Sequence, residues 1–192
     1  MYCSDVSGAF DRVFRLRLCD KLRRSGLHPK IVAFLASWLE DRISRVVVGG
    51  QQSDAKILAN SVFQGTVFGP PLWNIFYEDS RHAARCLEFL ETVFADDFNC
   101  WKKICFETDV TTTHILAHNE LRAAQRELHL WGVANRVAFD PSKESFHLLH
   151  RRFHDGDNFK ILGVTFDPQL LMQAPRCPSS TAKAQGENEA KH

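Results

Sequence analysis

Hydrophobic positions along the chain repeat at two spacings, and the spacing changes from one segment to the next. Apolar residues three and four apart predict helices over 9–25, from Pro29 to about 39, from Pro71 to about Arg85, and around 117–131. Short runs rich in Val, Ile and Phe predict strands at 46–48, near 57–58, at 146–149 and over 159–166. The chain therefore alternates between helices and short strands.

The segment from Phe89 to Trp101 predicts a β-hairpin with Asp96 and Asp97 at its turn, because aspartate is a turn residue that is disfavoured inside strands. Asp5 lies in a second short extended stretch, near the N-terminus. The Gly- and Pro-rich stretch 64–71 predicts a loop. From residue 172 the chain is polar and aperiodic, which predicts a disordered tail over 172–192.

Length and composition set only broad limits. The 192 residues suit one domain, or one domain with a tail, and 44% hydrophobic and 24% charged residues are ordinary for a globular protein. The formal net charge of +1 neither indicates nor excludes a nucleic-acid partner. The six cysteines lack C-x2-C spacing, and no signal peptide or membrane-length apolar run is present. We therefore expect an intracellular protein, cytoplasmic or nuclear, that has no membrane partner.

Three aspartates are the candidate chemical groups: Asp5 at a strand end, and Asp96 with Asp97 at a hairpin turn. Two carboxylates ~4 Å apart repel by about 1 kcal/mol in water and ~4 kcal/mol at an effective dielectric of 20, so such a cluster is costly without a cation. Magnesium prefers oxygen ligands and often shares protein carboxylates with substrate phosphates. The Asp-Asp dipeptide alone is more often a solvated turn, and only its neighbours give it meaning.

Those neighbours form an ordered series of motifs. The stretch 5–13 (DVSGAFDRV) resembles motif A of reverse transcriptases from non-LTR retrotransposons, and 61–76 (SVFQGTVFGPPLWNIF) resembles their motif B, usually PQGSVLGPLLFNIF. The stretch 94–97 (FADD) resembles motif C, 139–145 (FDPSKES) resembles motif D, and 159–164 (FKILGV) resembles motif E. Each match is weak or moderate alone. Together, in the family's order, they identify the chain as similar to this family over about 5–171.

The resemblance implies an α+β fold, a polymerase palm whose antiparallel sheet packs against helices, with fingers and thumb largely absent. It implies that 1–171 is the palm domain, incomplete at its N-terminus. Its reaction would be RNA-templated DNA synthesis by a two-metal mechanism, with two Mg²⁺ ions, or Mn²⁺ in their place. The implied partners are an RNA template, a DNA primer, deoxynucleoside triphosphates and the missing fingers and thumb segments of a longer polyprotein.

The resemblance also implies a role for each motif residue. Asp5 and Asp96 would ligate both metals with support from Asp97, and Lys143 would act as general acid on the leaving pyrophosphate. The nucleotide-binding residues would be Val6, Phe10, Gln64 and Gly65, with Phe10 as a steric gate against a 2′-hydroxyl. The primer grip would contain Leu162 and Gly163.

Several of these residues have plainer interpretations when they are taken alone. A single Phe10 is more often a core aromatic, a single Lys143 more often a surface lysine, and the basic run over 12–24 is better explained as the solvated side of a helix. Phe63 stands where the family has proline, and Pro71 where it has leucine, which leaves the fine placement of Gln64 open. Two competing hypotheses follow: a degenerate, inactive fragment that binds nucleic acid weakly at most, and an unrelated α/β domain whose Asp pair is a surface turn.

Overall fold

The computed structural model describes residues 1–58, 60, 62–105, 109–150 and 156–171. It divides into two compact units, Met1–Leu148 and Leu149–His192, which are described separately. The predicted tail over 172–192 lies outside the described residues. Among the described residues, no helix combines the length and the apolar character that crossing a membrane requires.

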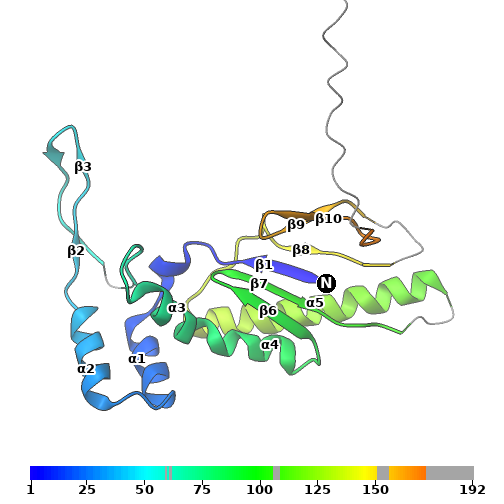
Figure 1. The fold of residues 1–192 in the computed structure, drawn as a ribbon, viewed down its shortest axis with the longest axis horizontal. Helices are drawn as coiled ribbons and strands as arrows, with labels where there is room; N and C mark the ends of the chain where they lie inside the picture. The colour runs from blue at the N-terminus through cyan, green and yellow to red at the C-terminus, as the bar shows by residue number, and fades with distance from the viewer. Residues whose placement is uncertain (59, 61, 106–108, 151–155, 172–192) are drawn as a thin grey trace, which may run out of the picture. The chain divides into compact units, whose positions relative to one another are not determined.

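The first unit is built on a four-stranded antiparallel sheet with strand order β6-β7-β1-β8 (Figure 1). Strand β1 (Tyr2–Asp5) lies between β7 (Asp97–Trp101) and the short β8 (Ser145–Phe146), while β6 (Leu90–Phe94) forms the edge. All four residues of β1 are buried, as expected for a central strand that is covered on both faces. The hairpin β6–β7 has the predicted position and Asp96 lies in its turn, but Asp97, predicted for the turn, is the first residue of β7 and pairs with Phe94.

Helices α5 (Val110–Asn135) and α4 (His82–Arg85) contact each other and lie against the sheet, α5 at β1 and α4 at β6 (Figure 1). Asp109 caps α5 by accepting a hydrogen bond from the Thr112 amide at 2.7 Å. The predicted face of α5 is the buried one; its apolar members are Ala117, Leu121, Ala124 and Leu128. Mixed helices and antiparallel sheet confirm the α+β part of the predicted fold.

Two predicted helices are interrupted. The expected helix over 9–25 is wrong as one element, because a 3₁₀ turn (Ala9–Arg12) and α1 (Arg15–Arg24) are separated by extended backbone at Val13 and Phe14. Val13 is buried there, and Phe14 forms a β-bridge with Asn60. The expected helix over 71–85 is also divided; its pieces are α3 (Gly69–Tyr77), the 3₁₀ helix η2 (Glu78–Arg81) and α4.

Helix α2 (Pro29–Trp38) begins at proline as predicted, and a two-stranded ribbon over 43–58 follows it (Figure 1). We call this segment the ribbon. It pairs β2 (Ile43–Ser44) with β5 (Lys56–Ile57), and β3 (Val47–Val48) with β4 (Gln51–Gln52). Its turn uses Gly49 and Gly50 at φ of 57° and 79°, a region that glycine adopts without strain. Its apolar side chains are exposed; the most exposed are Val48 and Ile57, each at 73%.

The predicted single strand over 159–166 is wrong, because the second unit has a small antiparallel hairpin there, formed by β9 (Phe159–Ile161) and β10 (Val164–Phe166). Its turn consists of Leu162 and Gly163, both at positive φ (49° and 81°). The Phe159 and Phe166 rings stack with centroids 5.7 Å apart, which fixes the register of the two strands.

Candidate active site

The strand register of the sheet brings two of the predicted carboxylates together. Asp5 ends β1 and is the direct cross-strand partner of Asp97, the first residue of β7. Asp96 occupies the adjoining turn, where burial and then the Asp5 carboxylate disfavour its ionisation and raise its pKa. Asp5 is buried, at 8% exposure, whereas Asp96 and Asp97 are half-buried. Segments more than 90 residues apart in the sequence thus meet at one end of the sheet.

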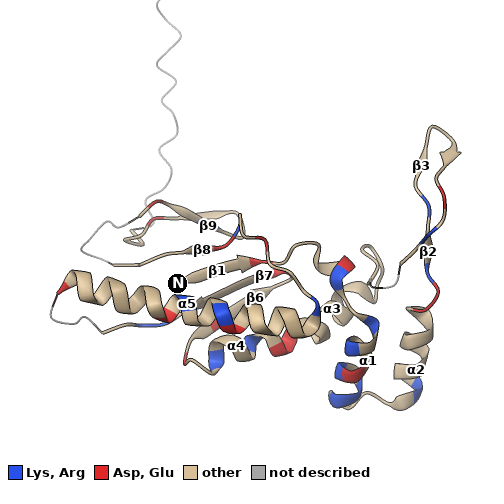
Figure 2. Cartoon of the chain, turned by 180° about the vertical axis from the view of Figure 1, so that it is seen from behind, with Lys and Arg blue, Asp and Glu red and all other residues tan. Residues whose placement is uncertain are grey.

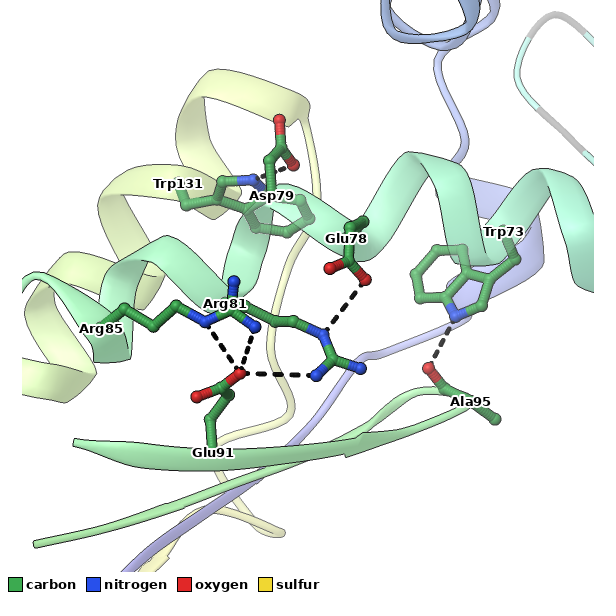
Figure 3. A network of polar contacts seen from close by, with 8 residues as sticks. All are labelled: Trp73, Glu78, Asp79, Arg81, Arg85, Glu91, Ala95 and Trp131. Atoms are coloured by element: carbon green, nitrogen blue, oxygen red, sulfur yellow. Dashed lines mark hydrogen bonds and ion pairs between the residues drawn. The ribbon is translucent and has the colours of Figure 1, made fainter. Parts of the chain in front are cut away.

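The turn that carries Asp96 is tied to helix α3 by one hydrogen bond. The Trp73 indole N–H donates to the Ala95 carbonyl at 2.7 Å (Figure 3). Trp73 is itself fixed, because it is 1% exposed and stacks on Tyr77 with centroids 4.9 Å apart. Ala95 has φ of 53°, which is uncommon for a residue with a Cβ. The bond therefore holds the turn in a conformation that its own residues do not favour.

Away from this turn, a network of charged side chains attaches strand β6 to η2 and α4. The Glu91 carboxylate, whose side chain is 9% exposed, pairs with Arg85 at 2.6 Å and with Arg81 at 3.4 Å (Figure 3). Arg81 also pairs with Glu78 at 3.1 Å. Burial favours the neutral form of Glu91, but the hydrogen bonds and charges of the two arginines outweigh it and hold its pKa below the usual range. The hairpin is thus bound to the helices at both ends.

The gathered carboxylates resist ionisation. Burial, followed by the charge of Asp5 and a hydrogen bond with it, raises the pKa of Asp96, although backbone hydrogen bonding partly offsets the change. Burial and the charges of Asp5 and Asp96 likewise raise the pKa of Asp97. The pKa of the buried Tyr77 hydroxyl is also raised, first by burial and then by the charges of Asp96 and Asp5. The negative potential of the cluster therefore extends into the core beneath it.

Lys143 brings a positive charge to this cluster. Its ammonium group hydrogen-bonds and pairs with the Asp5 carboxylate, and this contact, followed by the charge of Asp5, raises the Lys143 pKa. The loop that carries Lys143 is joined to the strand end, because the Asp140 amide donates to the Asp5 carbonyl at 3.0 Å. The Lys143 amide in turn donates to the Asp140 carbonyl at 3.0 Å. The predicted lysine and the predicted aspartate are therefore direct neighbours.

The donor set can be compared with the needs of a magnesium ion. Asp5, Asp96 and Asp97 supply only carboxylate oxygens, the ligand type that Mg²⁺ prefers. Burial and neighbouring negative charge raise the pKa of Asp96 and Asp97, and a bound cation would favour their ionised form. Within the described residues, however, no three His, Cys, Asp or Glu side chains are already arranged to hold an ion. The three carboxylates therefore have the chemistry that Mg²⁺ requires, and in this conformation the Lys143 ammonium group supplies the positive charge beside them.

The other predicted nucleotide residues lie before the 3₁₀ turn, within it and in the loop that precedes α3. Val6 is buried at 2% exposure and forms a β-bridge with Phe139. Phe10 is half-buried, with its ring centroid 6.0 Å from that of Trp73. Gln64 and Gly65 form an exposed turn, with Gly65 at φ of 84°. Gly69 allows this turn to approach α3, because a Cβ at Gly69 would lie 2.9 Å from the Phe63 carbonyl oxygen.

Leu162 and Gly163, predicted for the primer grip, form the turn of the second unit's hairpin, and the Leu162 side chain is 52% exposed. Helix α1 carries much of the basic run, and Figure 2 shows Lys and Arg along it. Part of that charge is paired within the chain: Lys21 contacts Asp79 at 2.7 Å, Arg23 contacts Asp20 at 2.8 Å, and Arg15 contacts Glu40 at 2.7 Å.

Two residues near the carboxylates were not among the predicted site residues. Trp73 reads in the sequence as one more apolar position of a helix, and only its indole N–H hints at a polar partner. Glu144 follows Lys143 and reads as an ordinary surface glutamate, yet its side chain is only 8% exposed. No local sequence pattern could have found either, because their partners lie on other elements.

The sequence comparisons agree with the motifs. No family model matches the chain. It is 39% identical over 183 residues to the RNA-directed DNA polymerase from the mobile element jockey of Drosophila melanogaster, covering 86% of this chain and 19% of that protein. The jockey polymerase of Drosophila funebris is 36% identical over 147 residues, with 72% and 15% covered. A probable RNA-directed DNA polymerase from transposon BS of Drosophila melanogaster is 33% identical over 105 residues, with 50% and 12% covered.

The chain thus combines two observations. Aspartates meet at one end of its antiparallel sheet, and its sequence is related to those of mobile-element polymerases over most of its length. The chain therefore belongs to the reverse transcriptase family of non-LTR mobile elements. It spans about a fifth or less of the length of the curated relatives it matches.

Proposed function

We propose that this chain is the palm segment of a reverse transcriptase and that it carries the carboxylates for RNA-templated DNA synthesis. The observation that supports this most directly is the strand register, which sets Asp5 opposite Asp97 with Asp96 in the adjoining turn. Aspartates from separate strands must meet at one point for this chemistry, and a turn beside a central strand accomplishes that. We also propose that this palm domain extends over residues 1–171.

In this proposal, Asp5 and Asp96 hold two Mg²⁺ ions, and Asp97 supports them. Bound ions of this kind supply charge stabilisation to the attacking 3′-hydroxyl oxygen and to the leaving oxygen of the triphosphate. Burial and the charge of Asp5 raise the pKa of Asp96 and Asp97, and this supports the assignment because bound cations favour the ionised form of both groups. Mn²⁺, which takes the same oxygen ligands, is the alternative ion.

The remaining predicted residues would bind or orient the substrates, or donate a proton. Lys143, protonated and beside Asp5, would approach the triphosphate and donate a proton to the leaving pyrophosphate. The Phe10 ring, braced by Trp73, would block a sugar 2′-hydroxyl, and the turn at Gln64 and Gly65 would line the base and the template. Val6 would contribute through its main chain. Leu162 and Gly163 would contact the primer, at a hairpin turn whose shape suits a backbone approach.

This chain covers at most 19% of the length of any of these curated relatives. Other parts of a longer protein would therefore help it to hold the RNA template, the DNA primer and the deoxynucleoside triphosphates. Such a protein would work inside the cell, where its template and triphosphates are found. Positioning supplies many kcal/mol of catalysis, so the palm alone should be a poor polymerase. The alternative, an inactive fragment that binds nucleic acid weakly, is favoured by one observation: Lys143 already neutralises Asp5.

A primer-extension experiment tests the proposal. The chain would be assayed on an RNA template with a DNA primer, alone and joined to the flanking segments of the Drosophila melanogaster jockey polymerase. We expect Mg²⁺-dependent extension by the joined protein, and its loss to background in Asp96→Asn. Asp54→Asn, in the exposed ribbon, is the matched control and should extend normally. A folded joined protein that extends no primer would favour the inactive alternative.

A further inference from the structure

Glu144 is the most heavily hydrogen-bonded carboxylate near the site, although it does not face the cluster. Its side chain is only 8% exposed. It accepts a hydrogen bond from the Tyr2 hydroxyl, another from the Gln125 amide at 3.1 Å, and a longer one from the Ser4 hydroxyl at 3.4 Å. The His129 Nε2 lies 2.7 Å from the same carboxylate. The Tyr2, Ser4 and His129 contacts converge on Oε1 of Glu144, and the Gln125 contact is to Oε2, so both oxygens of the carboxylate are engaged.

The donors come from two elements that frame the site. Tyr2 and Ser4 alternate with Cys3 and Asp5 along β1, so they lie on the face of the strand opposite to Asp5. Gln125 and His129 are four residues apart on α5 and therefore share one face of that helix. The His129 ring is held in turn, because it stacks on Phe139 with centroids 5.2 Å apart and planes at 11°. Glu144 thus joins the loop after Phe139 to both the strand and the helix.

Consecutive residues of this loop contact opposite faces of β1. Lys143 pairs with Asp5 on one face, and Glu144 binds Tyr2 and Ser4 on the other. Backbone bonds also hold the loop: the Asp140 amide donates to the Asp5 carbonyl, the Lys143 amide donates to the Asp140 carbonyl, and β8 pairs with β1. These bonds position the main chain on both sides of Ser142. The buried Glu144 side chain is the anchor that follows Lys143 directly, so it restrains the backbone rotation on which the direction of the Lys143 side chain depends.

We propose that Glu144 is a positioning residue: by binding β1 and α5, it holds Lys143 against the Asp5 carboxylate. The inference rests on the proposed function, since it concerns the residue assigned there as proton donor. Glu144 itself takes no part in the chemistry. An acceptor of the same length is what the position requires, since both elements present donors to it.

The test removes the acceptor while keeping the length of the side chain. In Glu144→Met, we expect the nuclear Overhauser contacts between the Lys143 side chain and the Asp5 β-protons to disappear, in metal-free buffer at fixed pH and without substrate. Glu144→Gln should keep them, because its amide oxygen still accepts from Tyr2 and His129, and a rotated Gln125 amide can accept from its NH₂ group. The matched control is Glu120→Met on α5. The Glu120 carboxylate pairs with Lys102 at 2.9 Å, and its removal should leave the Lys143 contacts intact.

A folded Glu144→Met chain that retains the contacts, or a Glu144→Gln chain that loses them, overturns the proposal. If Glu144→Met does not fold, Tyr2→Phe decides by the same measurement: it removes one donor and keeps the ring near Phe146, and it should weaken the contacts. In the joined polymerase, Glu144→Met should lower kcat for nucleotide incorporation by about tenfold or more with little change in KM, as expected for loss of a proton donor. A wild-type joined protein without activity would count against the proposed function, while the substrate-free measurement would still decide the role of Glu144.

Discussion

Two antiparallel hairpins of this chain have similar local signals and very different surroundings. The hairpin β6–β7 adjoins the central strand, and helices hold it through Trp73 at its turn and through Glu91 along β6. The ribbon has a glycine turn and β-branched residues, yet Val48 and Ile57 remain largely exposed. A two-stranded hairpin is at best marginally stable in isolation. The difference shows that tertiary anchors, rather than hairpin propensity, decide which of the two can hold carboxylates in place.

Removing the anchor at the turn should have the largest effect on this difference. Trp73→Ala leaves a cavity in the core and an unpaired Ala95 carbonyl, so we expect a loss of about 3–5 kcal/mol in unfolding free energy, measured by urea denaturation. Trp73→Phe keeps a ring and loses only the N–H donor, which should cost about 1–2 kcal/mol. Equal losses in the two variants would show that the hydrogen bond accounts for the whole effect and that the packing of the ring adds nothing, contrary to our expectation.

Breaking the charged anchor should have a smaller effect. Glu91→Gln replaces a carboxylate that pairs with Arg81 and Arg85, and we expect a loss of about 1–2 kcal/mol at pH 7. Because the pKa of Glu91 is lowered in the folded protein, its contribution is complete above the unfolded value of about 4.3 and is lost as pH falls through the lowered folded value. Wild type and Glu91→Gln should therefore converge in urea midpoint at acidic pH. Glu88→Gln, on an exposed carboxylate, is the control.

Replacing a carboxylate that the hairpin presents should raise the unfolding free energy, whereas the substitutions above lower it. The pKa of Asp96 is raised, so its ionised form is disfavoured in the folded chain, and this penalty grows as pH rises from about 3.9 through the folded value. Asp96→Asn should thus be more stable than wild type at pH 7 in metal-free buffer, with a gain that vanishes in acid. Solvent screening of a half-buried group keeps the gain below the losses above. A destabilised Asp96→Asn chain would mean that the aspartate is supported by contacts that asparagine cannot make.

The ribbon should respond least. Val48→Thr alters a side chain that is 73% exposed, and we expect a change within about 0.5 kcal/mol by the same urea measurement. A loss above 1 kcal/mol would indicate that the ribbon packs against part of the chain, and the comparison between the two hairpins would then fail.

The sequence predicted features that depend on near neighbours. The hairpin with Asp96 at its turn, the start of α2 at Pro29 and the buried face of α5 all follow from local spacing. The break at Val13 and Phe14 was missed because it depends on a bridge to Asn60, 46 positions after Phe14. The meeting of Asp5 with Asp97 was expected only through the family resemblance, since no spacing rule specifies which strands pair. Glu144 escaped prediction because its partners belong to β1 and α5.

The bond from Trp73 to Ala95 sets this chain apart from the usual form of its motif. The usual form of motif B has phenylalanine at this position, and phenylalanine has no N–H to donate. The carbonyl of residue 95 belongs to the main chain and persists whatever side chain occupies that position. A phenylalanine at 73 would therefore leave the carbonyl of residue 95 without this donor, whatever residue the turn carried, and the tryptophan is a donor that the usual form of the motif lacks.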